Sequence, residues 1–172
     1  MITIRRLTPA DAAAHRAQML EAYERHPEAF TTSASERVDL PLSYWAERLA
    51  PGSHAPSAVL GAFHEDGDRL VGAAGLSVES RIKSRHKGLL FGMYVAPEAR
   101  RHGAGQQLVE AVLAAARERG DLRVVQLTVT EGNEGALALY ERCGFQVFGV
   151  EPMAVRIGER FFAKVHMWCE LA

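Results

Sequence analysis

"LLFGMYVAPEARRHGAGQQLVEAVLAAARERG", residues 89–120, is the stretch that decides the fold. It begins with an apolar run of strand length at 89–95 and ends with an alanine-rich segment that carries an apolar stripe, formed by Leu108, Val109, Val112, Leu113 and Ala116. The change from a strand-like run to a 3.6-residue period predicts a strand that leads into a helix over 104–119, with Gly120 as its stop.

Two arginines, a histidine and a Gly-Ala-Gly step, residues 100–105, lie at this strand-to-helix junction. A helix N-terminus leaves backbone N–H groups without partners and carries partial positive charge, and glycine lets a backbone approach a ligand closely. The junction therefore predicts a pyrophosphate site; a tight turn with solvated arginines is the alternative. Neither a Walker P-loop nor a G-x-G-x-x-G dinucleotide motif is present.

Outward from this junction, apolar runs and turn residues predict the remaining elements. Thr8, Pro9 and Asp11 predict a capped helix start. Strands are expected at 2–7, 57–63, 69–78, 88–95, 124–130, 145–150 and 160–171, and helices at 9–26, 42–50, 104–119 and 133–143, with a hairpin turn in "HEDGD" (64–68). This order, β-α-α-β-β-β-α-β-α-β-β, predicts an α+β fold with a mostly antiparallel sheet of about seven strands, flanked by about four helices. With no repeat or linker, a single domain over 1–172 is expected.

The composition and charge of the chain argue against several classes of function. The 172 residues carry a formal net charge of -1, which gives no general attraction to nucleic acid or membrane. No run of about 18 apolar residues and no secretory signal are present, so a cytoplasmic protein is expected. Cys143 and Cys169 are expected to be buried free thiols. The seven histidines are scattered without ligand spacing, which predicts no metal site.

A second segment, "EGNEGALALYERCGF" (131–145), follows the next predicted strand. Asn133, Ala136 and Tyr140 are spaced i, i+3, i+7, so they share one face of a helix. That face is either the wall of a ligand site or a helix cap followed by two core residues.

Together the two segments resemble the GCN5-related N-acetyltransferase (GNAT) family. The 100–105 segment matches the family's Arg/Gln-x-x-Gly-x-Gly/Ala pattern, and the second segment matches its Asn, Ala, Leu-Tyr and Gly-Phe positions at Asn133, Ala136, Leu139-Tyr140 and Gly144-Phe145. The resemblance covers the whole element order, and its specific motifs lie between 89 and 145.

The resemblance implies an N-acetyltransferase that uses acetyl-CoA as co-substrate, without a metal. The acceptor, a small-molecule or peptide amine, would enter between the first two helices and the last hairpin and attack directly in a ternary complex. Nucleic acid and membrane partners are not expected, and the chain would be a monomer or homodimer. The implied CoA-binding residues are Met93, Tyr94, Val95, Arg100, Arg101, His102, Gly103, Ala104, Gly105, Gln106, Asn133, Ala136 and Tyr140.

Within this set the resemblance gives particular roles. Backbone groups of Met93 and Val95 would pair with the pantetheine arm, the amides of 101–105 would hold the pyrophosphate, and Asn133 would bond the arm. Tyr140 would serve as general acid toward the thioester sulfur.

The general base is the open position. Some relatives carry Glu or His on the strand before the loop, where this chain has Leu89 and Phe91. Glu131 is the first substitute, followed by Glu79 and His86; a water relay or an amine that arrives neutral would also serve. A non-catalytic acyl-CoA binding or sensing domain therefore stays as the alternative function.

Two further groups have open interpretations. The basic run at 81–87 is expected to be a solvated loop, and contact with an acidic acceptor or a nucleotide phosphate is the alternative. Tyr44 and Trp45, on the predicted second helix, are either core residues or part of the acceptor pocket.

Overall fold

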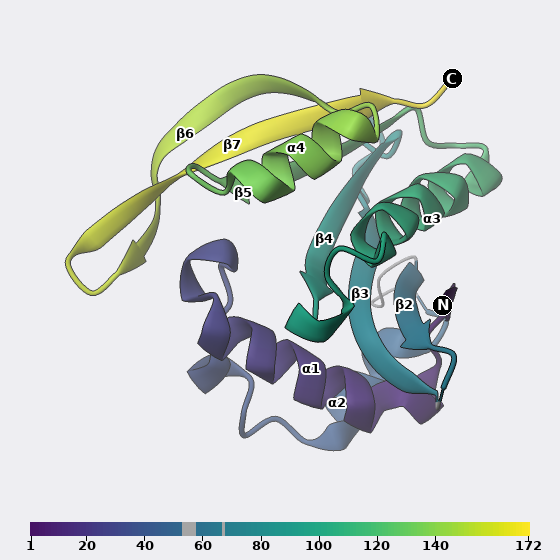
Figure 1. Ribbon diagram of the computed structural model, residues 1–172. Helices are drawn as coiled ribbons and strands as arrows, with labels where there is room; N and C mark the ends of the chain where they lie inside the picture. Colours follow the sequence, from purple (N-terminus) through teal and green to yellow (C-terminus); the bar gives the residue numbers. More distant parts are fainter. Residues whose placement is uncertain (53–57, 67) are drawn as a thin grey trace.

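The computed structural model describes residues 1–52, 58–66 and 68–172 (Figure 1). Its strands are β1 Ile2–Arg6, β2 Ala58–His64, β3 Arg69–Val78, β4 Lys87–Val95, β5 Val124–Thr130, β6 Gln146–Ile157 and β7 Arg160–Glu170. Its helices are α1 Ala12–Arg25, α2 Leu42–Leu49, α3 Ala104–Arg119 and α4 Glu134–Arg142, with 3₁₀ turns at Pro9–Asp11, Pro27–Ala29, Ala34–Glu36 and Pro97–Ala99.

The strands form one sheet in the order β1-β2-β3-β4-β5-β7-β6. All neighbouring strands in it are antiparallel except β4 and β5, which are parallel and are joined through α3. The predicted α+β class and element order are confirmed, and α3 has the predicted bounds. None of the described helices has both the length and the apolar character needed to cross a membrane.

The sheet separates two helical layers (Figure 1). The larger core packs α3 and α4 against one face, with Leu108, Val109 and Val112 of α3 fully buried. A smaller core on the other side packs α1 and α2, with Met19, Trp45 and Leu49 buried. The apolar stripe read from the sequence of α3 is therefore the face that anchors this helix to the sheet.

The centre of the sheet is split. Parallel pairing between β4 and β5 covers only Lys87–Leu89 against Val124–Gln126. Further along β4, Gly92 and Met93 lie opposite the single residue Ala74 of β3, and Gly92 has φ +60°. Such a bulge bends its strand away from the regular ladder. Beyond Leu89 the two strands therefore diverge, and an opening forms between them.

Some details differ from the sequence-based expectations. The strand predicted at 145–150 continues to Ile157 as β6, through Pro152; β6 is an edge strand with register shifts against β7, so a residue without a backbone N–H is tolerated there. Cys169 is buried as predicted, but Cys143 is only partly buried. Ser57 and Gly67, at the predicted strand start and hairpin turn, lie outside the described residues.

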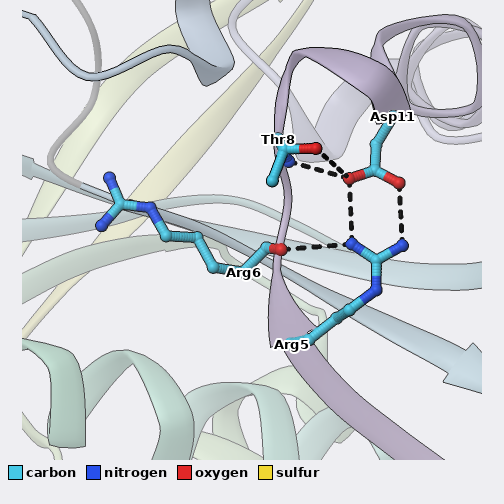
Figure 2. Close-up of polar contacts among 4 residues, drawn as sticks. All are labelled: Arg5, Arg6, Thr8 and Asp11. Carbon is cyan, nitrogen blue, oxygen red and sulfur yellow. Dashed lines mark hydrogen bonds and ion pairs between the residues drawn. The ribbon is translucent and has the colours of Figure 1, made fainter.

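A charged cluster fixes the chain where β1 leads into the first helix (Figure 2). The Asp11 carboxylate accepts hydrogen bonds from the Thr8 N–H at 2.8 Å and from both terminal nitrogens of Arg5 at 2.9 Å. Arg5 also donates to the Arg6 carbonyl at 3.2 Å. These donors, with Arg5 the largest contributor, lower the pKa of Asp11 to about 2. The predicted capping arrangement of Thr8 and Asp11 is thus extended by an ion pair to the preceding strand.

Replacing Asp11 by Ala is expected to destabilise the fold by about 1 kcal/mol, the usual value of such a cap, and to lower Tm by about 2–4 °C at pH 7. Because the folded-state pKa lies below the ordinary value of 3.8, this stabilisation is present above that value and fades as the pH falls toward 2. Thermal melting of the wild type and the variant from pH 7 to 3 measures it. Asp39→Ala, at an exposed position, is the control. A difference in Tm that persists undiminished at pH 3 would contradict the ionic origin.

Candidate active site

A cavity of about 1210 Å³ occupies the opening between β4 and β5. It is continuous from the start of α3 to the layer formed by α1 and α2. The turn Pro27–Ala29 bounds it as well, because the Thr130 hydroxyl donates to the Glu28 carbonyl at 2.6 Å and Lys164 Nζ donates to the Ala29 carbonyl at 3.4 Å. The C-terminal end of α1 is thereby tied to β5 and β7 across the split sheet.

The open edge of β4 supplies backbone donors and acceptors to this cavity. The Ala96 N–H donates to the Val71 carbonyl of β3, so by strand alternation Met93 and Val95 direct their N–H and C=O groups toward β5. The Arg100 Nε donates to the Val95 carbonyl at 3.0 Å and its Nη2 lies 3.0 Å from His26 Nε2. This edge can accept an extended ligand as an added strand.

The junction ahead of α3 has a backbone geometry that suits an anion. Gly103, the N-cap, has φ +77°, and Arg101 has φ +67°. The Gln107 N–H donates to the Gly103 carbonyl at 3.0 Å, so the preceding N–H groups of 104–106 lack intrahelical acceptors and face the helix end. These orphan donors and the helix dipole favour an anion such as phosphate.

Gly105 is needed for close packing at the same junction. A Cβ added there would lie 3.1 Å from Leu139 and 3.5 Å from Met93, so a larger residue would push α3 away from α4 and β4. The Gln106 side chain is turned along the helix, where its Nε2 donates to Glu110 Oε1 at 2.8 Å. Only the backbone of Gln106 therefore faces the loop in this structure.

α4 forms the opposite wall. Asn133 is its N-cap, and its Oδ1 accepts from the Ala136 N–H at 3.2 Å, which leaves Nδ2 as the group able to donate to a ligand. Tyr140 lines the same cavity although it is 6% exposed, and its ring packs edge-on against Phe145. Burial, with a smaller contribution from Cys143, raises the pKa of Tyr140, so its hydroxyl stays protonated through the neutral range. Asn133 therefore caps the helix and Tyr140 is buried in the core, and both residues also line the cavity.

The two β4 positions considered for a base, Leu89 and Phe91, carry no titratable group. Leu89 and Phe91 line the cavity, and the Phe91 ring lies over Gly75, where an added Cβ would come within 2.4 Å of it. Glu131, exposed at the end of β5, also lines the cavity. Glu79 and His86 lie at the other end of β4, outside the cavity lining. Of the three predicted substitutes, the structure brings only Glu131 to the site.

Most of the residues predicted to bind the cofactor line this one cavity: Met93, Tyr94, Val95, Arg100, Arg101, Gly103, Gly105, Gln106, Asn133, Ala136 and Tyr140. His102 is exposed and Ala104 is buried in the core, and neither is part of the lining, so Ala104 has only its backbone to offer. Within the described residues, no group of three or more His, Cys, Asp or Glu is arranged to hold a metal ion.

The end of the cavity beneath α1 and α2 contains residues that the sequence analysis did not single out as site residues. His15, Arg37, Arg48 and Lys164 join Tyr44 and Trp45 there. Arg37 lies in a polar connection, and the others fall on separate helices and a strand, so no motif spacing links them. The tertiary fold alone brings them together.

The fold and the cavity together define a class: an α+β protein whose split sheet leaves a long cavity that reaches the start of α3. The family model described as "Acetyltransferase (GNAT) family" matches residues 17–145. This match spans well over half of the chain, and the chain belongs to the acetyltransferase (GNAT) family.

Individual relatives agree with this assignment. The chain is 32% identical over 145 residues to a mycothiol acetyltransferase of Salinispora tropica; the match covers 84% of this chain and 44% of that relative. The chain thus spans less than half the length of this curated relative.

Solved structures show the same fold. A GNAT-family acetyltransferase from Streptococcus pneumoniae superposes with a TM-score of 0.84 at 26% identity, over 99% of both chains. A putative acetyltransferase from Salmonella typhimurium, solved with acetyl-CoA, superposes with a TM-score of 0.80 at 23% identity, over 100% of this chain and 95% of that one. At this identity the second likeness concerns the fold.

Proposed function

We propose that the protein is an acetyl-CoA-dependent N-acetyltransferase that transfers the acetyl group to a primary amine by direct attack in a ternary complex. One observation carries the proposal: a single cavity joins the candidate anion site at Gly103, the open edge of β4 and a separate side-chain-lined end beneath α1 and α2. A long ligand with phosphates at one end and a reactive group near the middle fits this shape. The far end remains for a second substrate.

The residues present fit coenzyme A. The N–H groups at the start of α3, with Arg101, would hold the pyrophosphate. The open edge at Met93 and Val95 would pair with the pantetheine amides, and Asn133 Nδ2 would donate to the same arm. Together these contacts would fix the thioester beside Tyr140 on one side and the acceptor end of the cavity on the other.

The chemistry needs three contributions from the protein. The bound thioester supplies an activated acetyl group, and holding it next to the amine provides much of the rate. A backbone N–H at Met93 or Val95 would polarise the carbonyl as negative charge develops on its oxygen. Tyr140, whose raised pKa keeps it protonated, would donate its proton to the departing sulfur.

Removal of the amine proton is assigned to Glu131. It is the carboxylate at the C-terminal end of β5, and its backbone N–H is fixed by the Ala163 carbonyl at 3.0 Å. Its exposed position lets it exchange protons with water directly. The acceptor itself is a small-molecule or peptide amine.

Gly103→Glu is expected to abolish CoA binding, because it places a side chain and a negative charge in the anion site. Gly120→Glu is the matched control. Gly120 ends the same helix with a similar φ of +74° and has open space around it. Both variants therefore introduce the same backbone strain, but only Gly103→Glu places a side chain at the proposed anion site. Calorimetric titration with CoA measures the difference. Equal CoA affinity in the two variants would contradict the assigned site.

Tyr140→Phe is expected to keep the ring, its packing on Phe145 and most of the CoA affinity, while kcat falls by roughly 10²-fold, the scale of a general acid. The loss should be smaller with a thioester whose leaving thiol is more acidic, because that sulfur needs less protonation. Steady-state kinetics measure this, and thermal melting checks the fold. An unchanged kcat where chemistry limits turnover would remove Tyr140 from the mechanism and favour a non-catalytic acyl-CoA binding domain.

Glu131→Gln is expected to lower kcat/KM by roughly 10²-fold near pH 7, with recovery at high pH, where the amine is already neutral. Glu134→Gln, exposed on the first turn of α4, is the matched control. A pH–rate profile of both variants tests the role. A uniform loss at all pH values would point to positioning instead of proton removal.

A further inference from the structure

The acceptor end of the cavity has a cationic and aromatic lining. Arg37 donates a hydrogen bond to the Tyr44 hydroxyl. The guanidinium carbons of Arg37 and Arg48 lie 5.2 and 5.6 Å from the centroid of the same Tyr44 ring. Tyr23 and Trp45 line the cavity beside them. Two guanidinium groups are therefore held on one aromatic side chain at the wall of the cavity.

Neither guanidinium has a carboxylate partner in the described part of the chain. Glu36, which precedes Arg37 in the sequence, accepts hydrogen bonds from Ser33. The Ser33 N–H and Oγ lie 2.8 and 2.7 Å from the Glu36 carboxylate. Among the described residues that line the cavity, six are Arg or Lys and two are Glu. The planar guanidinium fork is the group best suited to bind a carboxylate in two-point geometry.

Buried nitrogen atoms without partners lie at the same place. Trp45 is 3% exposed, and its Nε1 has no hydrogen-bond partner among the described residues. Nδ1 of His15, whose ring lies edge-on to Trp45 with centroids 6.0 Å apart, also lacks one. Burial, together with the charge of Arg48, lowers the pKa of His15 to about 4, so the ring is neutral at physiological pH. Both nitrogen atoms are buried, so their missing partners add an energetic cost at this wall but offer no donor within direct reach of a ligand.

The phosphates of CoA do not account for this charge. Arg37 and Arg48 belong to the α1–α2 layer, on the face of the sheet opposite α3. The anion site at 101–106 begins α3, which packs on the other face. The apolar side chains of Leu89 and Phe91 line the cavity as well and bring no charge to it. The cationic pair thus belongs to the second substrate.

We propose that the acceptor is an amine that also carries a carboxylate, such as an amino acid, and that Arg37 and Arg48 bind this carboxylate. The proposal rests on the proposed acetyl transfer and names its substrate class. The apolar floor at Leu89 and Phe91 would contact the side chain of the acceptor. With the carboxylate fixed at this wall, the amine is directed toward the thioester.

The test compares each amino acid with its carboxamide and its decarboxylated amine as acetyl acceptors. We expect the best amino acid to exceed its neutral counterparts by about 10- to 100-fold in kcat/KM, the scale of a charge-assisted hydrogen bond. A peptide that begins with Glu and is amidated at its C-terminus forms a separate arm, which distinguishes a free amino acid from an acidic peptide as the source of the carboxylate.

Variants of the two arginines test whether these side chains bind the carboxylate. Arg37→Gln and Arg48→Gln are each expected to raise KM for carboxylate acceptors by about 10-fold or more, and to leave neutral amines and CoA affinity unchanged. Arg48→Lys keeps the charge without the fork and should recover part of the loss. Arg85→Gln, in the exposed turn before β4 and outside the cavity lining, is the matched control. Thermal melting verifies that each variant folds.

Calorimetry with the enzyme–CoA complex separates this inference from the proposed activity. Tighter binding of amino acids than of their amides, lost in the arginine variants, supports the carboxylate site even if no turnover is seen. Equal binding or turnover of charged and neutral amines, arginine variants that reduce both alike, or no binding of any carboxylate-bearing amine would overturn it. Absence of CoA binding would instead refute the proposed function.

Discussion

The loss of pairing between β4 and β5 beyond Leu89 is the constraint on which the rest of the structure depends. A central strand of a sheet normally has both edges satisfied, and unpaired backbone groups away from water are costly. Here the bulge at Gly92 and Met93 bends β4 away and leaves the groups of Met93 and Val95 facing an opening. The Val95 carbonyl already accepts from Arg100 Nε, and a ligand with its own amides would pair with the groups that stay open, so the candidate site follows from an interrupted ladder.

Positive charge lies at two places along the cavity, and its physical origin differs between them. At the start of α3 it comes mainly from the backbone: orphan N–H groups, the helix dipole and a left-handed Gly103. At the α1–α2 end it comes from two guanidinium groups on one tyrosine ring. The first arrangement suits a phosphate held by many short contacts. The second suits a small planar anion, which connects the shape of the cavity to the chemistry of two substrates.

The two residues proposed as acid and base lie in contrasting environments. Tyr140 is buried, its pKa is raised, and it is held in place by packing against Phe145. Glu131 is exposed at the end of β5, where proton exchange with water is easy. The β4 positions between them are occupied by Leu89 and by Phe91, whose ring needs the missing side chain of Gly75. The floor of the cavity is therefore apolar, and the two proposed proton-transfer residues lie on its walls.

The sequence by itself determined the element order, the exact span of α3 and the position of the phosphate-type loop, because periodicity, glycines and caps act over a few residues. It also indicated Asn133 and Tyr140 as candidates, since a spacing of seven residues, about two helical turns, places them on one face of a helix. Only the tertiary structure decided that Arg37, Arg48, His15 and Trp45 share one wall, that Glu131 reaches the cavity while Glu79 and His86 do not, and that Pro152 lies within an edge strand. These facts depend on which distant segments pack together and on where a ladder breaks, and neither is encoded in local spacing.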